Sequence, residues 1–348
     1  MTTPKEDGLT MPAEWQAHSQ CWMAWPSDGS MWGDRLPAVE EAYAAVARAI
    51  ADFEPLSVVA APENAARVSL ACGRGVSVLT LPHDDGWLRD TGPTFVTDGP
   101  PTAEGDVGVA GVDWQFNAWG QVAGHFGNDA LVAKEMLSHL KMRRYAAPLV
   151  LEGGSFHVDG EGTVLANEKC LLNPNRNPEL GRDEIEKLLC DHLGADKVIW
   201  LAGGLTEDHT DGHVDNVACF ARPGAVIALT TQDADDEDCE ILEENIARLR
   251  SATDARGREL EVIQIPQPRR REHQGRRLAM SYVNFYLANG AVIAPQFDQP
   301  EDKKALAVLK EAFPERAIVP VDSIAFAYGG IHGITQQQPA GTPLPERN

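Results

Sequence analysis

Short apolar runs alternate with helical patterns along the whole chain. Between many of these runs, apolar residues recur every three or four positions, which is the period of an amphipathic helix. The β-type runs lie at residues 21–25, 56–60, 76–81, 197–201, 225–229, 260–265, 280–286 and 291–294, and the helical patterns at 36–53, 127–141, 182–193, 237–250 and 303–313. Strands and helices that interleave in this way predict an α/β fold.

No long Ser- or Gly-rich linker divides the interior of the chain. About six strand–helix modules in one uninterrupted chain predict one large domain or a pseudo-symmetric array. Residues 1–10 are polar and residues 338–348 are rich in proline, so we expect a disordered N-terminal tail and a C-terminal tail on either side of a single domain at 11–337.

Composition narrows the class of protein. A chain of 348 residues buries enough surface to fold without disulfides, and its six cysteines form no CxxC pair. We therefore expect a reduced, cytoplasmic protein. The first residues lack the apolar core of a signal peptide, and no stretch reaches 18 apolar residues, so no membrane association is expected.

Charge excludes one class of partner. The chain has 30 Lys and Arg against 52 Asp and Glu, which gives a net charge of −22. A nucleic-acid binder needs a basic face, so we expect no nucleic-acid partner. An acidic surface suits a small cationic substrate by electrostatic steering, although solubility alone also accounts for it.

Acidic and glycine-rich clusters follow several of the apolar runs. The first, HDDGWLRDTGP at 83–93, places three carboxylates and an arginine in eleven residues. Asp90 is a candidate to hold a cation with Trp87 as a wall, and an acidic turn with Arg89 paired locally is the alternative. In the second cluster, Glu152 ends an apolar run and precedes two glycines. The glycines would let the backbone approach a neighbouring group closely, whereas the alternative is a hairpin turn.

The third cluster, EDHTDGHVDN at 207–216, has four carboxylates and two histidines in ten residues. His213 and Asp215 are two positions apart, so on a strand they would share a face. Such a pair can transfer protons and hold a cation, and a metal site is the rival interpretation. The fourth cluster, YGGIHGITQQ at 328–337, marks tight backbone geometry and by itself indicates no reaction.

Taken together, the motifs of this chain resemble those of the agmatine deiminase family, in the guanidino-group-modifying (pentein) superfamily. Seven motifs occur in the family's order over residues 11–337. They are MPAEWQAH with CWMAWP at 11–26, WLRDTGP at 87–93, FNAWG at 116–120, LEGGSFHVDG at 151–160, LLNPNRNP at 171–178, TDGHVDN at 210–216 and IHGITQQ at 331–337.

The resemblance implies a fold of five α/β modules around a pseudo-fivefold axis, with the site at the centre. It implies hydrolysis of agmatine to N-carbamoylputrescine and ammonia in polyamine synthesis, without metal or cofactor, by a homodimer. A cysteine thiolate attacks the guanidinium carbon in that mechanism. By motif, Asp90 and Asp215 would grip the guanidinium, His213 would be the general acid/base, and Glu152 would orient His213. Trp87 and Trp119 would be pocket walls, and Asp208 is a further substrate-binding candidate.

One departure from the family pattern concerns the nucleophile. The family reads IHCITQQ in its final motif, and here Gly333 stands in the place of the cysteine. Glycine has no side chain and cannot form a covalent intermediate. The Gly run between Tyr328 and Ile331 is also short for the family, and neither Cys21 nor Cys219 has an evident reason to replace the missing thiol.

Several interpretations remain open from the sequence. The chain is either an altered agmatine deiminase whose nucleophile is missing, or a pseudoenzyme that binds a guanidino or polyamine ligand without turnover. A metal-dependent guanidino hydrolase is a further alternative, because Glu207, His209 and Asp211 alternate as in some metal-binding signatures. An interaction protein with an inactive site would bind no such ligand at all.

Overall fold

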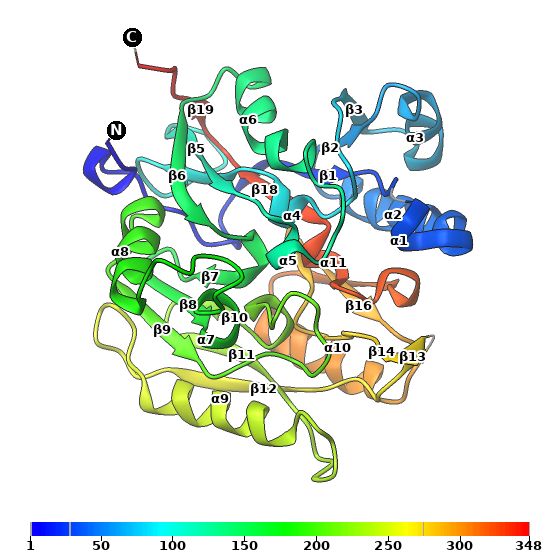
Figure 1. Ribbon diagram of the computed structural model, residues 1–348, viewed down its shortest axis with the longest axis vertical. Coiled ribbons are helices and arrows are strands. Elements are labelled where there is room, and N and C mark those ends of the chain that lie inside the picture. The colour runs from blue at the N-terminus through cyan, green and yellow to red at the C-terminus, as the bar shows by residue number, and fades with distance from the viewer. Residues whose placement is uncertain (1, 28, 274, 348) are drawn as a thin grey trace.

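The computed structural model describes residues 2–27, 29–273 and 275–347 and shows a mixed α/β architecture (Figure 1). Five separate small sheets repeat one order of elements: a first strand, an antiparallel second strand, a helix, and a third strand parallel to the second. The α/β class predicted from the alternating pattern is therefore confirmed. Within the described residues, the strand pairing forms no closed barrel, because each sheet keeps its own set of strands.

Four modules follow one another along the chain. Their elements are β4 (Thr94–Thr97), β5 (Gly108–Gln115), α6 (Asp129–His139) and β6 (Arg144–Val150); β7 (Phe156–Val158), β8 (Thr163–Asn167), α8 (Arg182–Leu193) and β9 (Lys197–Leu201); β10 (Ala218–Arg222), β11 (Ala225–Thr230), α9 (Cys239–Ser251) and β12 (Glu261–Pro266); and β15 (Tyr286–Ala288), β16 (Ala291–Gln296), α10 (Glu301–Ala312) and β17 (Ala317–Asp322).

The fifth module is assembled from both ends of the chain. Its first strand is β18 (Thr335–Pro339), which pairs antiparallel with β1 (His18–Ala24). From β1 the chain runs through α2 (Leu36–Ala51), the parallel strand β2 (Leu56–Ala60), α3 (Ala65–Cys72) and β3 (Val76–Thr80). Pairing of β18 with β1 thus brings the C-terminal motif beside the N-terminal one.

The remaining elements are short. They are η1 (Lys5–Asp7), α1 (Gly29–Trp32), η2 (Gly33–Arg35), α4 (Leu88–Thr91), α5 (Ala118–Gln121), η3 (Gly153–Ser155), α7 (Glu168–Leu171), η4 (Val214–Asn216), β13 (Glu272–His273), β14 (Arg276–Arg277), η5 (Ile324–Phe326), α11 (Gly330–Gly333) and β19 (Thr342–Pro343). Among the described residues, none of the helices combines the length and the apolar character needed to cross a membrane.

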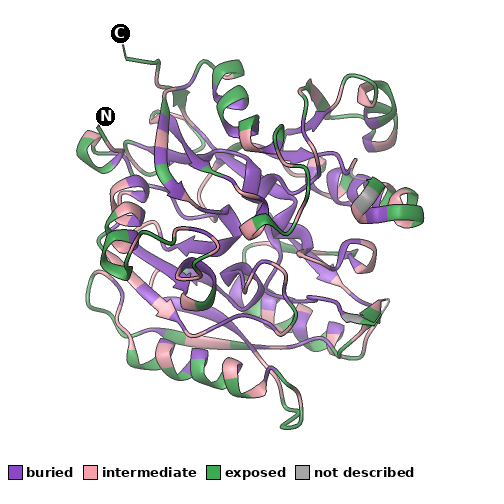
Figure 2. Cartoon of the chain, viewed as in Figure 1, coloured by how far each residue is buried: buried purple, intermediate pink, exposed green. Residues whose placement is uncertain are grey.

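The helices lie at the periphery and the strands point inward, so buried residues gather towards the middle of the molecule (Figures 1 and 2). Second strands such as β11 and β16 are buried along almost their whole length, because a helix packs on one side and neighbouring modules on the other. This explains why the sequence shows them as continuous apolar runs rather than as alternating ones.

The apolar run at 280–286 is not a strand as predicted. Only Tyr286 belongs to β15, and residues 280–285 form an irregular buried segment. Its apolar side chains pack into the core, which gave the run its strand-like composition, but Asn284 at its centre is fully buried and directs its amide towards neighbouring turns. Burial without strand pairing explains the difference.

The two predicted tails are packed against the domain. Residues Lys5–Asp7 form η1, and Leu9 is buried with an exposed fraction of 1%. The Thr10 N–H donates to Thr97 O at 2.9 Å. At the other end, Gln338 and Pro339 complete β18 and Thr342–Pro343 pairs with β5. The polar composition of these segments was misleading because their backbone groups pair with strands of the domain.

We expect Leu9→Ala to destabilise the folded chain by about 2–5 kcal/mol, the usual cost of truncating a buried leucine. Leu70→Ala is the matched control, since Leu70 is 85% exposed; its effect should stay within roughly 0.5 kcal/mol. Urea unfolding followed by circular dichroism measures both. Equal effects of the two substitutions would show that the N-terminal segment does not pack as described.

Candidate active site

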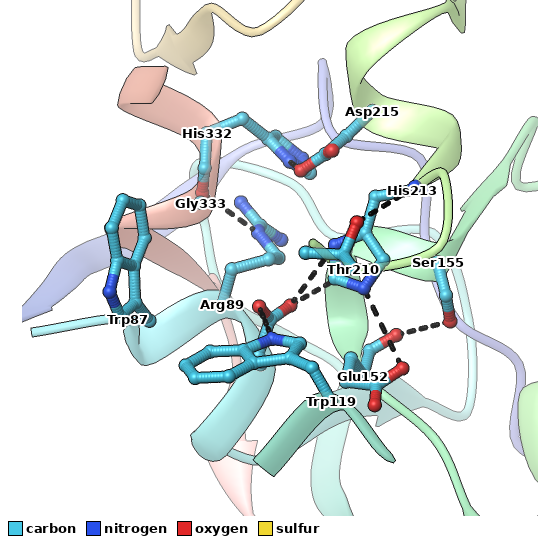
Figure 3. Close-up of polar contacts among 12 residues, drawn as sticks. Trp87, Arg89, Trp119, Glu152, Ser155, Thr210, His213, Asp215, His332 and Gly333 are labelled. Carbon is cyan, nitrogen blue, oxygen red and sulfur yellow. Dashed lines mark hydrogen bonds and ion pairs between the residues drawn. The ribbon is translucent and has the colours of Figure 1, made fainter. Parts of the chain in front are cut away.

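The candidate residues come from equivalent places in the modules. A short segment leads into the first strand of each module. The segments are α4 before β4, η3 before β7, η4 before β10, the irregular segment 280–285 before β15, and α11 before β18. Figure 3 shows that Glu152, Asp215, His332 and Gly333, from or beside three of these segments, lie close together. Repetition of one module therefore brings together residues that lie far apart in the sequence.

Buried carboxylates surround His213. Asp90 Oδ1 lies 3.9 Å from His213 Nδ1, and Glu152 Oε2 lies 3.6 Å from His213 Nε2. Burial alone would lower the pKa of His213, but the negative charges of Asp90, Asp215 and Glu152 outweigh it and raise this pKa to about 9. His213 is therefore protonated at neutral pH and can give up a proton to a leaving group.

Glu152 is held by a buried guanidinium. Arg176 Nε donates to Glu152 Oε1 at 2.9 Å, and both side chains are fully buried. Burial opposes ionisation, but contacts with His213 and Arg176 lower the pKa of Glu152 below its ordinary value. Glu152 Oε2 and His213 Nε2 have no other hydrogen-bond partner and face each other. The predicted pairing of Glu152 with His213 agrees with this geometry.

Asp90 has hydrogen bonds to both carboxylate oxygens. Trp119 Nε1 donates to Asp90 Oδ2 and the Gly154 N–H donates to Asp90 Oδ1, each at 2.9 Å. Burial, together with the negative charges of Asp215 and Glu152, raises the pKa of Asp90. A cation placed here would relieve this repulsion, so the site favours a positively charged ligand.

Trp119 reaches Asp90 from a left-handed backbone turn. Residues Ala118–Gln121 have φ values between +55° and +79°, and Asn117 Oδ1 accepts the Gly120 N–H at 2.8 Å. Such φ values are costly for residues other than glycine, and they persist only where the surrounding structure holds the backbone in place. Here the turn directs the indole of Trp119 towards Asp90.

The glycine pair after Glu152 is required by close approach, which was one of the two interpretations that the sequence left open, and not by a hairpin turn. A Cβ atom on Gly153 would lie 2.1 Å from the Arg89 carbonyl oxygen. On Gly154 it would lie 2.5 Å from His213 Nδ1 and 2.9 Å from Asp215 Oδ2. The backbone of η3 can therefore lie this close to Arg89, His213 and Asp215 only because Gly153 and Gly154 carry no side chains.

Asp215 belongs to a buried polar network that the clusters did not reveal. Asp215 Oδ2 lies 2.9 Å from His332 Nδ1, and His332 Nε2 lies 2.9 Å from Glu14 Oε1. Glu14 also approaches Arg89 NH1 and His157 Nε2, each at 3.5 Å. Glu14 and His332 lie within the first and last motifs of the sequence, but no local concentration of charge distinguished them there.

Gly333 lines the same pocket as the charged residues. The pocket is lined by Met31, Trp87, Asp90, Trp119, His209, Thr210, His213, Asp215, Asn216, Tyr328, Gly329 and Gly333. A Cβ on Gly333 would lie 3.4 and 3.5 Å from two ring atoms of Trp87, which is close to ordinary contact, and Gly333 has no positive φ. A small side chain would therefore fit at this position.

Trp87 and Trp119 line the pocket, whereas Asp208, the further substrate-binding candidate, does not. Asp208 Oδ1 accepts hydrogen bonds from the Thr210 N–H and hydroxyl at 2.9 and 2.6 Å, and Asp208 Oδ2 accepts one from Asn216 at 3.2 Å. It braces the loop that carries His213. His213 and Asp215 do not share the face of a strand, because Asp215 lies in the 3-10 turn η4 that follows His213.

In the part of the chain that the structure describes, two clusters have the spacing of metal ligands: Glu14 with His157 and His332, and Glu152 with Cys170 and His213. Each already contacts a guanidinium, Arg89 in the first and Arg176 in the second, so the carboxylates are neutralised without an ion. The alternating trio at 207–211 is directed to separate partners, since Glu207 accepts the Arg277 N–H at 2.7 Å and Asp211 pairs with Arg176.

Within the described residues, no cysteine lines the pocket. Cys21, Cys170 and Cys219 are buried elsewhere, and burial raises the pKa of each of these thiols. A buried neutral thiol is a poor nucleophile. The structure therefore offers no described cysteine in the place that the sequence leaves vacant at Gly333.

The chain is similar to known deiminases over almost its whole length. Residues 10–339 match the family described as Porphyromonas-type peptidyl-arginine deiminase. An agmatine deiminase of Stutzerimonas stutzeri is 46% identical over 366 aligned positions, which cover 97% of this chain and 98% of that protein.

Solved structures of agmatine deiminases are also similar to this chain. An agmatine deiminase of Enterococcus faecalis, described as catalysing its reaction, has a TM-score of 0.92 and 37% identity and covers 98% of both chains. An agmatine deiminase of C. jejuni, in a Cys-to-Ser form with substrate bound, has a TM-score of 0.87 and 25% identity over 96% of this chain and 97% of that one.

The raised pKa of His213 gives a pH dependence of stability. The folded chain binds this proton more tightly than the unfolded chain, whose histidine has the ordinary pKa of 6.5. The stabilisation is complete below pH 6.5 and is lost as pH rises through about 9. Relative to His213→Gln, the free energy of unfolding should fall by a few kcal/mol across this window, because one pKa unit corresponds to about 1.4 kcal/mol.

Urea unfolding of both proteins at several pH values measures this difference. His192→Gln is the matched control, because burial lowers the pKa of His192 and its contribution therefore changes only at lower pH. A difference between the native chain and His213→Gln that stays constant through the window would show that the carboxylates do not hold a charged His213.

Proposed function

The chain belongs to the agmatine deiminase family, among the Porphyromonas-type peptidyl-arginine deiminases of pentein fold, and from this membership we propose that it binds agmatine in the pocket lined by Asp90, His213, Asp215 and Gly333. We further propose that the chain is a crippled deiminase, because Gly333 stands where the family motif has its nucleophilic cysteine. The buried carboxylates around a charged histidine are the single observation that carries the proposal.

The guanidinium group suits these carboxylates. It is planar and positively charged, and it offers paired N–H donors that carboxylates accept. Asp90 and Asp215 are both buried and both line the pocket, so a guanidinium between them would meet a negative oxygen on each side. Trp87 and Trp119 would enclose the planar group, and an aromatic face also attracts a cation.

Proton transfer would fall to His213. In the mechanism that the family resemblance implies, a thiolate adds to the guanidinium carbon and ammonia leaves with a proton from the histidine. The neutral histidine then takes a proton from water, whose oxygen attacks the same carbon. The carbon–sulfur bond breaks, which returns the thiolate and releases the urea-type product. A His213 pKa of about 9 supplies the proton for the first step, and Glu152 with Arg176 holds the imidazole in place.

The first step of that mechanism has no attacking atom in this chain. Gly333 lines the pocket, but it carries no side chain, and no described cysteine takes its place. A bound guanidinium would therefore persist unreacted. The substrate-bound Cys-to-Ser form of the C. jejuni relative supports this part of the proposal, because its substrate is retained in the structure.

Three alternatives are separated by experiment. A guanidino- or polyamine-binding pseudoenzyme would bind the ligand without turning it over. A metal-dependent hydrolase would require added manganese and would be silenced by a chelator. A pure interaction protein would show no stabilisation by agmatine. From the resemblance we retain the proposal of a cytoplasmic homodimer that acts in polyamine synthesis.

Ammonia release from agmatine is the first test. We expect no release above background from the native chain and measurable turnover from Gly333→Cys, since a Cβ fits beside Trp87. Gly333→Ser is the matched control, because it fills the same space without a thiol and should stay inactive. Turnover by the native chain that survives a chelator would contradict the missing-nucleophile proposal, and turnover that needs manganese would favour the metal-dependent alternative.

Ligand binding tests the role of Asp90 independently of turnover. Asp90→Asn in the native chain should weaken agmatine affinity by about 1 kcal/mol or more, roughly fivefold, because a charged hydrogen bond is lost. Asp113→Asn is the control, since Asp113 is also buried but pairs with Arg144 away from the pocket. Isothermal titration calorimetry measures both. Equal affinities of Asp90→Asn and the native chain would remove Asp90 from the ligand site.

A further inference from the structure

His332 is placed between two buried carboxylates, one of which lines the pocket. Its Nδ1 lies 2.9 Å from Asp215 Oδ2 and its Nε2 lies 2.9 Å from Glu14 Oε1. All three side chains are at most 6% exposed. Figure 3 shows the imidazole of His332 directed at Asp215, on the turn that ends at Gly333.

This geometry fixes the charge of the ring. A neutral imidazole has one N–H, so it could donate to only one of the two carboxylates and would present a lone pair to the other. Two contacts of 2.9 Å to carboxylates are satisfied together by the doubly protonated ring. The same charge compensates both acids, and a contribution from His332 holds the pKa of Glu14 well below its usual range despite burial.

Other charged groups face this assembly. Arg89 Nε donates to the His332 carbonyl at 3.2 Å, and Arg89 NH1 lies 3.5 Å from Glu14. His157 Nε2 lies 3.5 Å from Glu14 Oε2, while its Nδ1 accepts the Phe220 N–H. Burial and the Arg89 charge oppose protonation of His332, but Glu14 and the two carboxylate contacts outweigh them and raise the pKa of His332.

The backbone of His332 is fixed as firmly as its ring. Asn284 Oδ1 accepts the N–H of His332 at 2.8 Å and that of Gly333 at 3.3 Å. The amide Nδ2 of Asn284 donates to Asn216 Oδ1 and to the Asp215 carbonyl. One buried side chain thus joins the turn of His332 to the turn of Asp215, so the separation of ring and carboxylate is set from both sides.

We propose that His332 is a positioning residue: a fixed imidazolium, shared by Asp215 and Glu14, that orients Asp215 towards the pocket and places a positive charge one residue from position 333. The role of Asp215 rests on the proposed function, but the charge of His332 and its effect at position 333 do not. The consequence for any thiol placed at 333 is a lower pKa than it would have without His332, because a nearby cation favours the thiolate.

The charge of the ring is measured directly in the native chain without ligand. Side-chain proton–nitrogen correlation spectra of histidines labelled with nitrogen-15 distinguish the imidazolium from both neutral tautomers. We expect both nitrogens of His332 to remain protonated above the pH at which an ordinary histidine loses its proton, as a buried ring between two carboxylates should. His332→Gln assigns the signal. Loss of a proton from the ring near its ordinary pKa would overturn the proposal.

The effect at position 333 is measured in Gly333→Cys. The rate of alkylation by iodoacetamide against pH gives the thiol pKa, which we expect to rise by about one unit or more when His332→Gln is added. His192→Gln in the same background is the matched control, since His192 is also buried but contacts only the Leu188 carbonyl. An unchanged thiol pKa, or an equal rise in the control, would overturn the proposed field.

The outcomes are separable from those of the proposed function. If agmatine fails to bind but His332 is doubly protonated and shifts the thiol pKa, the proposed function fails and this inference stands. If agmatine binds and the ring is neutral, this inference fails and the proposed function stands. Because the spectra use the native chain, an unfolded His332→Gln variant would still leave the charge of the ring measurable, with assignment through Asp215→Asn, which should change only the Nδ1 signal.

Discussion

Neutralisation of buried charge is the constraint on which the centre of this protein depends. Four carboxylates, Asp90, Glu152, Asp215 and Glu14, are buried, and each lies within 3.9 Å of His213 or His332. Burying an unpaired carboxylate is very costly, and removing one partner of a buried pair leaves the other uncompensated. The charges are balanced by two guanidiniums and two histidines, which are Arg89, Arg176, His213 and His332.

This balance also explains local choices that would otherwise look arbitrary. The close approach of η3 demands Gly154, because any Cβ there would intrude between His213 and Asp215. Asn284 must be polar although it is fully buried, because it satisfies the N–H groups of one turn and the acceptors of another. The positive φ values around Trp119 place its indole N–H where it donates to Asp90. Each of these features costs stability locally and is supported by the packed modules around it.

Local concentration of charge predicted part of the site from the sequence. Asp90, Glu152, His213 and Asp215 were found because each lies among acids, glycines or histidines that packing alone does not explain. Their partners Glu14, Arg89, Arg176, Asn284 and His332 were missed, since pairing across modules cannot be read from neighbours in sequence. The α/β class followed from periodicity, whereas the run at 280–286 and the two ends were misassigned because burial and strand pairing are separate properties.

The pairing of β18 with β1 has a consequence for how the protein is made. A nascent chain emerges N-terminus first, so β1 is present long before its antiparallel partner exists. Until the final segment is released, the strand keeps an unpaired edge, and both the turn that carries His332 and the wall at Gly333 are absent. Until then Asp215 and Glu14 lack the imidazole of His332 that lies between them, and Glu14 has only Arg89 and His157 as nearby cationic or imidazole groups. The pocket that Gly333 lines is therefore completed in a single late step of synthesis.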